Sequence, residues 1–389
     1  MSKHKIAHIN LCGLVTEGLQ YQDNLLLKYH NIMGFKTYMI TSIYSQNKFG
    51  KAVKEEKTHY FNDYGVETFR LREDFFTRLS KRFKRYPGLK QLIKSIKPDI
   101  LFVHGVQFIN LITIRKYLIN NPDTFLYIDN HADFSNSGKN FFSYLFFHKI
   151  LWRYNSKLIK KYVTRFYGVL PARVEYLKNV YGIPEKNIKL LRLGADDEIY
   201  QKVYDNHSSK EIIISGLDST KKIIVSGGKF DYSKTDIIHL IKAVENHEDF
   251  QLIIFGSISK EIKNLVKIDN KKHTFYVGWR EPEEVYQYFK LADIIAFPGR
   301  HSVLWENAIV FKKPMILKYW PGVTHLNVND NVLFAKQSTY DDYNDVLSYL
   351  SIESNYTEIV NKAEKSQTDA FFYSNIAKSS VSEFLHDNS

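Results

Sequence analysis

Short apolar runs alternate with amphipathic stretches along most of the chain, which predicts strands that alternate with helices. Lys5–Leu11 has the pattern of a buried strand, and Leu19–Met33 then repeats its apolar residues at helical spacing. Gly34 stands where a helix would end, and Lys36–Thr41 has the pattern of a second strand. This strand–helix–strand order predicts the start of a parallel sheet.

The same alternation continues to about residue 320 and indicates an α/β protein. Further strands are expected at Ile100–His104, Phe125–Asp129, Phe166–Leu170, Ile188–Leu193, Lys222–Ser226, Phe250–Phe255, His273–Val277, Ile294–Phe297 and Pro314–Tyr319. Gly194–Gly216 is polar and lacks strong periodicity, so we place an inter-domain linker there. Two successive halves of this kind predict two Rossmann-like, doubly wound parallel sheets that face a cleft.

Composition agrees with two globular domains. The chain has 389 residues, of which 44% are hydrophobic and 25% charged, so disorder is not expected. The single cysteine, Cys12, cannot form an internal disulfide and fits a reducing compartment. The apolar run Ile6–Leu11 is too short for a signal peptide, and no run reaches the roughly 18 residues of a membrane span. We therefore expect a cytoplasmic protein.

The net charge of +12 is unevenly distributed. Residues 1–195 contain 32 Lys and Arg against 14 Asp and Glu, whereas the remainder contains 22 against 28. Basic residues crowd two stretches of the first half: Arg78, Lys81, Arg82, Lys84, Arg85, Lys90, Lys94 and Lys97, and the aromatic-rich Phe141–Arg165. Such a stretch suits a helix lying on an anionic membrane face, or a core helix with a solvated basic side. No nucleic-acid-binding module is recognisable, so we expect no nucleic-acid partner.

The strongest local motif lies in the second half, where Ser226–Lys234 follows an expected strand. Its glycines, Gly228 among them, let backbone approach a ligand closely, and Lys229 and Lys234 could clamp a diphosphate. The alternative is an ordinary glycine turn with two solvated lysines.

A second motif, Phe297–Ala308, runs from a strand end through a loop into a helix. Ligands bind at such carboxyl ends in open α/β sheets. Ser302 and Val303, at the start of the helix, could offer N–H groups to a phosphate, and Glu306 could accept hydrogen bonds from a ribose. The alternative is that Glu306 is a solvated helix residue.

The first half offers a third candidate, Asp129–Asp133, which also follows a strand. His131 and Asp133 could hold a proton or bind a sugar hydroxyl, whereas a turn-rich surface loop would have a similar sequence. His104, after another strand, is a weaker candidate. Gly13, in the first strand–helix loop, could admit a diphosphate closely.

These motifs together resemble the glycosyltransferases of family 4, which have the GT-B fold. The family's Gly-Gly-Arg/Lys loop with a second Lys five residues later is matched by Lys229 and Lys234, and the second Glu of its Glu-x7-Glu block by Glu306. Gly278 and Trp279 match the loop that caps the nucleotide base. Weaker matches, at Met33–Tyr38, Lys313–Pro314 and Asp330–Phe334, extend the resemblance over roughly residues 5 to 340.

The resemblance implies a metal-independent, retaining transfer from a nucleotide sugar to a saccharide or lipid-linked saccharide, as in capsule or surface-polysaccharide biosynthesis. It implies no cofactor and no metal ion. The implied domains are an acceptor domain at 1–195, a donor domain at 196–370 and a helix at 371–389 that packs back on the first domain. His131 and Asp133 would be catalytic.

One position departs from the family. Pro298 stands where the block has its first Glu, which in the family lies near the transferred sugar. Sugar contacts would then fall to the loop residues Gly299, Arg300 and His301. Two alternatives stay open: a non-hydrolysing sugar-nucleotide epimerase on the same fold, and a non-catalytic partner subunit that has lost residues.

Overall fold

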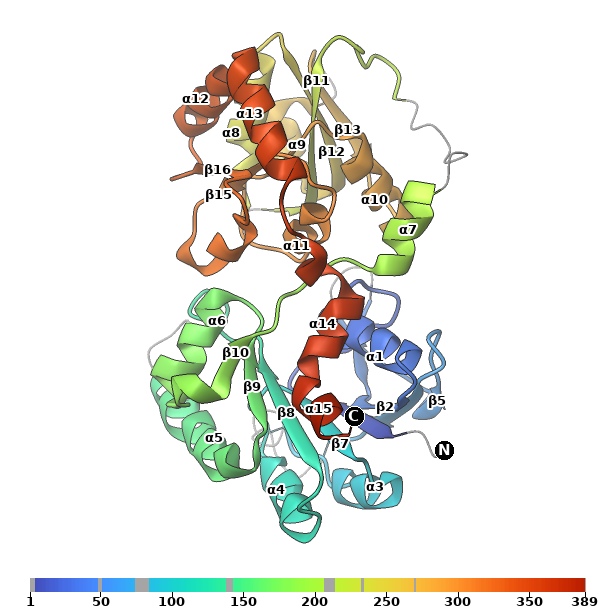
Figure 1. The fold of residues 1–389 in the computed structure, drawn as a ribbon. Coiled ribbons are helices and arrows are strands. Elements are labelled where there is room, and N and C mark those ends of the chain that lie inside the picture. The colour runs from blue at the N-terminus through green and yellow to red at the C-terminus, as the bar shows by residue number, and fades with distance from the viewer. Residues whose placement is uncertain are drawn as a thin grey trace. The chain divides into compact units, whose positions relative to one another are not determined.

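The computed structural model describes residues 4–47, 51–73, 84–137, 143–205, 214–231, 234–268 and 271–388. The chain forms two compact units (Figure 1). The N-terminal unit comprises Met1–Arg192 and Tyr373–Ser389, and the C-terminal unit comprises Leu193–Phe372. None of the helices in the described part of the chain combines the length and apolar character that a membrane span requires.

The N-terminal unit is built on an eight-stranded sheet. Its strands are β1 (Lys5–Asn10), β2 (Lys36–Ser42), β5 (His59–Phe61), β6 (Glu67–Leu71), β7 (Ile100–His104), β8 (Phe125–Asn130), β9 (Arg165–Gly168) and β10 (Ile188–Leu190). They lie in the order β10-β9-β8-β7-β1-β2-β6-β5, and all pairs are parallel except β5 with β6. A separate antiparallel pair consists of β3 (Tyr44–Gln46) and β4 (Ala52–Lys54).

Helices cover this sheet. They are α1 (Gln22–Ile32), α3 (Leu89–Ile96), α4 (Leu111–Asn120), η1 (Ser143–Trp152), α5 (Arg153–Ile159), η2 (Lys160–Tyr162), α6 (Pro171–Tyr176), η3 (Leu177–Tyr181), η4 (Glu185–Asn187), α14 (Tyr373–Ser380) and α15 (Ser382–Asp387). Neighbouring residues of β1 pack on opposite sides: Ala7 and Ile9 belong to one core cluster, whereas Ile6 belongs to another that includes residues of α14. The sheet is therefore buried on both faces, as a parallel sheet must be.

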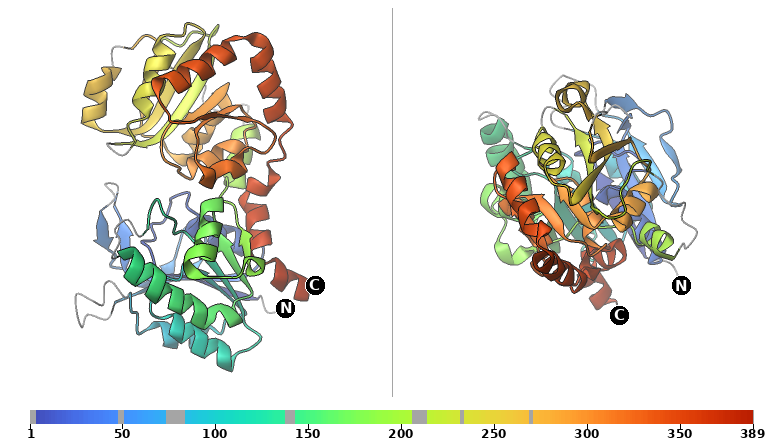
Figure 2. Two further views of the ribbon diagram at one scale, coloured as in Figure 1. Left: turned by 90° about the vertical axis from the view of Figure 1, so that its left-hand side faces the viewer. Right: turned by 90° about the horizontal axis from the view of Figure 1, so that it is seen from above.

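The C-terminal unit contains a six-stranded, fully parallel sheet in the order β13-β12-β11-β14-β15-β16. Its elements are α7 (Asp197–Asp205), β11 (Lys222–Phe230), α8 (Ile237–Glu245), β12 (Phe250–Ile258), α9 (Lys260–Val266), β13 (Thr274–Gly278), α10 (Pro282–Leu291), β14 (Ile294–Phe297), α11 (Leu304–Ile309), β15 (Met315–Lys318), η6 (Pro321–Leu326), β16 (Val332–Ala335), α12 (Tyr340–Ser351), α13 (Glu353–Glu364) and η7 (Asp369–Phe371). Helices flank this sheet on both sides (Figure 2), over two separate core clusters.

The expected α/β class with two doubly wound parallel sheets is confirmed, but the predicted linker at Gly194–Gly216 is wrong in its first part. Residues 197–205 form α7, and Ala195 and Val203 are buried in the core of the C-terminal unit. Lys290 of α10 donates to the carbonyl of Val203 at 2.8 Å. The apolar face formed by Ile199, Tyr200 and Val203 explains why this polar segment still packs as a helix. Residues 206–213 lie outside the described residues.

Candidate active site

Both sheets place polar residues where their strand order reverses. In the N-terminal unit the reversal lies between β1 and β7, and in the C-terminal unit between β11 and β14. At such a point, the helices that follow the two strands go to opposite faces of the sheet, which leaves a crevice at the carboxyl ends. The predicted site residues of each unit follow these strands or their neighbours.

The glycine motif of the C-terminal unit lies within β11, which extends beyond the predicted Lys222–Ser226 to Phe230. A Cβ atom on Gly227 would lie 2.0 Å from the ring of Phe255, so a larger residue cannot fit there. Gly228 has a φ of +138°, a conformation that L residues rarely adopt. These glycines therefore allow β11 to stay closely paired with β12 through Gly227 and Gly228.

The two predicted motifs of this unit meet at the carboxyl ends of β11 and β14. The Cβ position of Gly299 lies 3.4 Å from Cγ of Lys234, and that of Gly228 lies 4.0 Å from Leu304. The loop after β14 is held by the Ser338 hydroxyl, which donates to the carbonyl of Pro298 at 2.7 Å. Residues far apart in sequence thus form one polar edge.

Cationic side chains gather at this edge. Burial lowers the pKa of the Lys234 ammonium. The negative charge of Asp231 raises this pKa, but the positive charges of Arg300 and Lys229 lower it, and the net shift is downward. Lys229 itself is largely exposed, with Nζ 3.8 Å from the Asp231 carboxylate. An anion such as a diphosphate would relieve the mutual repulsion of these cations.

Glu306, in the first turn of α11, is fully buried. His301 Nε2 lies 2.8 and 2.9 Å from its two carboxylate oxygens, and His325 Nε2 lies 3.2 Å from Oε1. Burial alone would raise the pKa of this carboxyl, but the two histidines outweigh burial and lower the pKa to about 2. The alternative of a solvated helix residue is therefore wrong, and the carboxylate is ionised and already hydrogen-bonded.

The remaining predicted residues of this unit lie along the same edge of the sheet. Ser302 and Val303 immediately precede α11, and Gly278, with a φ of +78°, ends β13. Trp279 follows with 66% of its surface exposed, as suits a side chain free to stack on a ring.

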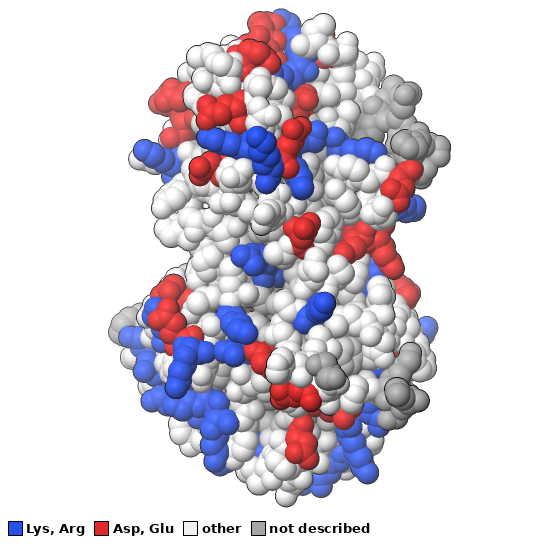
Figure 3. All heavy atoms as spheres, viewed as in Figure 1, with Lys and Arg blue, Asp and Glu red and all other residues white. Residues whose placement is uncertain are grey.

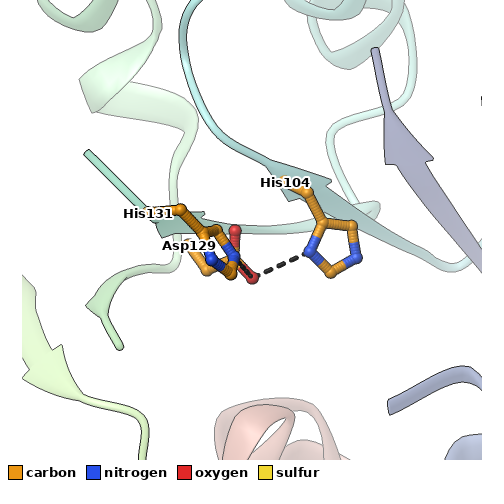
Figure 4. Close-up of side chains that lie close together, drawn as sticks. All are labelled: His104, Asp129 and His131. Carbon is orange, nitrogen blue, oxygen red and sulfur yellow. Dashed lines mark hydrogen bonds and ion pairs between the residues drawn. The ribbon is translucent and has the colours of Figure 1, made fainter. Parts of the chain in front are cut away.

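In the N-terminal unit, His104 ends β7 and Asp129 lies opposite it in β8, where the two are paired in register. His104 Nδ1 is 2.8 Å and His131 Nε2 is 3.2 Å from the same oxygen, Oδ2 of Asp129 (Figure 4). Asp129 is fully buried, while 45% of the His131 side chain is exposed. Burial would raise the pKa of Asp129, but the two imidazoles lower it, so the carboxylate is ionised.

Asp133 has a different environment from His131. Its Oδ1 accepts from the backbone N–H groups of Ser135 and Asn136, and its Oδ2 accepts from Arg173 at 3.0 Å. With these bonds Asp133 shapes the loop that carries His131. Gly13 lies in the β1–α1 loop, where its N–H donates to the Asn10 side chain at 3.2 Å.

Three histidines with buried side chains near these sites were not predicted from the sequence: His325 beside Glu306, His8 beside His104, and His30 beside His8. His8 did carry a signal, because it interrupts the apolar run of β1. The other two are brought in by tertiary structure alone. A surface pocket of the N-terminal unit is lined by His4, Asp99 and residues 122–125. It lies at the amino ends of β1, β7 and β8, whereas His104 and Asp129 lie at the carboxyl ends of β7 and β8.

Solved structures of low sequence identity share the whole fold. A glycosyltransferase from Rickettsia africae is 15% identical over 99% of each chain, with a TM-score of 0.67. Anabaena HepE in complex with UDP and glucose is 12% identical over 98% of this chain and 99% of that chain, with a TM-score of 0.65. A putative UDP-N-acetylglucosamine 2-epimerase from Listeria monocytogenes is 10% identical over 100% and 98%, with a TM-score of 0.62.

These similarities establish the GT-B fold for this chain. Residues 208–366, which include every predicted site residue of the C-terminal unit, match the family described as "Glycosyl transferases group 1". No curated protein matches the sequence. The fold and the family match together support a glycosyltransferase with a group 1 domain.

Proposed function

We propose that the protein transfers a sugar from a nucleotide-sugar donor to a saccharide or lipid-linked saccharide, in the manner of family 4. The observation that carries the proposal is the meeting of the Lys234 and Gly299 segments at the strand-order reversal of the C-terminal unit. This arrangement lies inside the segment that matches the glycosyltransferase family. The solved HepE structure with UDP supports a uridine nucleotide as the first donor to test.

The cations at this edge would bind the donor diphosphate. Lys229 and Lys234 would neutralise the negative charge that develops on the leaving group, with Arg300 close by. Gly228 would let the backbone approach the phosphates, as would Gly13 in the other unit, and Ser302 and Val303 would add N–H groups. Charge neutralisation of this kind requires no metal ion at the diphosphate.

Glu306 would hold the ribose. Three hydrogen-bond contacts from histidines already reach its carboxylate, which can accept about four. A bidentate ribose would therefore displace His301, whose side chain would turn toward the sugar beside Gly299. Gly278 and Trp279 would flank the base. Pro298 offers no carboxylate to the sugar, so these loop residues supply the contacts.

His131 would act at the reacting carbon. Because its Nε2 faces the Asp129 carboxylate, the hydrogen of a neutral ring lies on Nε2 and leaves Nδ1 as an outward acceptor. It would accept a hydrogen bond from a sugar hydroxyl rather than donate one. Asp133 would position the loop through Arg173. We infer retention of configuration, as in family 4.

The acceptor would lie at the cytoplasmic face of an anionic membrane. Large apolar side chains are exposed on η1 and α5, at Leu145, Phe146, Ile150 and Tyr154. Basic residues flank them, and Figure 3 shows Lys and Arg gathered over this part of the N-terminal unit. Such a surface suits peripheral attachment. The other basic stretch begins at Arg78, Lys81 and Arg82, which lie outside the described residues.

Incubation with a panel of nucleotide sugars distinguishes three classes of protein. A transferase releases the nucleoside diphosphate and moves the sugar to an added acceptor extract, with the anomeric configuration retained. An epimerase alters the sugar without any acceptor, and a non-catalytic subunit binds the donor and leaves it intact. Either of the last two results would overturn the proposal.

A further inference from the structure

A series of hydrogen-bonded imidazoles runs through the N-terminal unit. His30 Nδ1 lies 2.9 Å from His8 Nε2, and His8 Nδ1 lies 3.1 Å from His104 Nε2. His104 Nδ1 then meets Asp129 Oδ2 at 2.8 Å, the oxygen that His131 also approaches. His30, His8, His104 and Asp129 are buried, so water does not replace these contacts.

The far end of the series fixes where its hydrogens lie. His30 Nε2 is 3.1 Å from the backbone carbonyl of Ala377 in α14, and a carbonyl can only accept. The Ser380 hydroxyl oxygen lies 3.0 Å from His30 Nε2, but its hydrogen goes to that same carbonyl at 2.8 Å, so toward the ring the hydroxyl can only accept. His30 Nε2 therefore carries a hydrogen. Burial lowers the pKa of His30 to about 4, in keeping with a neutral ring.

Counting hydrogens along the series leaves one contact unfilled. There are four contacts in line, from Ala377 to Asp129, and three rings that carry one hydrogen each fill only three of them. With Nε2–H on His30, the rings of His8 and His104 also donate from Nε2. The lone pair of His104 Nδ1 then faces an ionised carboxylate at 2.8 Å. Two acceptors at this distance repel, so a cation belongs between them: a proton or a metal ion. Burial lowers the pKa of His104, but Asp129 outweighs burial and raises it, so a proton is the competing occupant.

The surroundings favour a metal ion. His104 Nδ1, a carboxylate oxygen of Asp129 and His131 Nε2 lie within 4.8 Å of one another. Oδ1 of Asp129 is buried and has no hydrogen-bond partner among the described residues. A bare carboxylate oxygen in such a place is costly unless a cation compensates it. His131 is half-exposed, which gives an ion a path from solvent.

We propose that His104, Asp129 and His131 bind one divalent transition-metal ion of the zinc type, an assignment that goes beyond the proposed sugar transfer. Two imidazoles and a carboxylate are a common ligand set for Zn²⁺, with the next position open to water or substrate. Ligand atoms about 2 Å from a tetrahedral ion lie roughly 3.3 Å apart, so the observed 2.8 and 3.2 Å to Asp129 Oδ2 need little adjustment, and the two imidazole nitrogens start within 4.8 Å of each other. His8 and His30 fix the tautomer of His104, as partners of metal-bound imidazoles do.

An ion here would also change what His131 offers to a substrate. With Nε2 on the metal, the ring hydrogen lies on Nδ1, and the outward nitrogen donates instead of accepting. The lysines assigned to the diphosphate, Lys229 and Lys234, belong to the C-terminal unit and are untouched. Metal occupancy therefore modulates turnover and leaves nucleotide affinity unchanged.

The test is a calorimetric titration of chelator-treated, full-length protein with Zn²⁺ alone. We expect one ion per chain, and His131→Ala, a half-exposed position that should fold normally, weakens binding by about a hundredfold or more. His59→Ala is the matched control, because His59 pairs with Glu67 at 2.9 Å on an exposed surface, and it leaves the affinity unchanged.

A second pair of variants tests the imidazole series. His30→Ala weakens Zn²⁺ binding about 10- to 100-fold, whereas His30→Gln, which keeps a donor and an acceptor, restores most of it. Co²⁺ should give an absorption spectrum that His131→Ala abolishes. No stoichiometric Zn²⁺ binding would mean that the cation is only a proton, and equal affinity in His131→Ala or loss in His59→Ala would place the ion elsewhere. Each of these results overturns the assignment.

Discussion

The buried carboxylate of Glu306 gives the most quantitative prediction. Its folded pKa of about 2 lies below the ordinary value of 4.5, so the ionised form stabilises the folded protein. One pKa unit corresponds to about 1.4 kcal/mol, which gives about 3 kcal/mol at neutral pH. This contribution is fully present above pH 4.5 and is lost as the pH falls toward 2. Glu306→Gln, which cannot ionise, should therefore lower the free energy of unfolding by up to about 3 kcal/mol at pH 7.

Urea denaturation of the parent and of Glu306→Gln at several pH values measures this difference. The difference in unfolding free energy between the two proteins should decrease below pH 4.5 and be roughly halved by pH 3. Glu248→Gln is the control: the pKa of Glu248 is also lowered to about 2, but its side chain is 70% exposed, so solvent screens its ion pairs. A Glu306→Gln effect no larger than that of Glu248→Gln, or one independent of pH, would refute this account of the His301–Glu306–His325 cluster.

Three further predictions concern other parts of the molecule. His131→Ala should lower turnover by about a hundredfold while nucleotide affinity, measured by calorimetry, stays unchanged; unaltered turnover would remove His131 from the reaction. Replacing Lys157, Lys160 and Lys161 by Gln should reduce sedimentation of the protein with anionic vesicles, and added salt should reduce sedimentation of the parent in the same way. Binding that does not depend on lipid charge would exclude electrostatic attachment. Gly227→Ala should destabilise the protein by about 1–3 kcal/mol in thermal unfolding, because the added Cβ would overlap Phe255. The control Gly13→Ala should be tolerated, because its Cβ would meet only Asn10, at 3.6 Å. Equal effects of the two variants would contradict the packing of β11 on β12.

The central strands could be predicted from sequence because each is a continuous apolar run. All five residues of β7, for example, are buried, so the run and the strand coincide. The segment that forms β6 alternates buried and half-buried residues near the sheet edge, and its pattern gave no such signal. The helix α7 was taken for a linker because its apolar face is only a few residues wide.

The candidate site was predictable where chemistry is local in sequence. Lys229, Lys234 and Glu306 stand in motifs whose spacing suggests a role. The partners that set their environments come from elsewhere, as His325 does for Glu306. His30 reaches Ala377 across 347 positions, and His8 lies near His104 only because β1 pairs with β7 in one register. Such contacts depend on tertiary packing, which residue patterns do not encode locally.

The edge of the C-terminal sheet should bind the diphosphate of a nucleotide-sugar donor. Calorimetric titration with UDP, and with other nucleoside diphosphates in parallel, measures this binding. We expect saturable 1:1 binding of at least one of them, weakened about tenfold or more by Lys234→Ala, since a charge-assisted contact contributes about 1.5–3 kcal/mol. The control Lys362→Ala, which removes a lysine paired with Glu358 in α13, should bind like the parent. Unchanged affinity in Lys234→Ala, or no binding of any nucleoside diphosphate by the parent, would show that this edge does not hold the donor diphosphate.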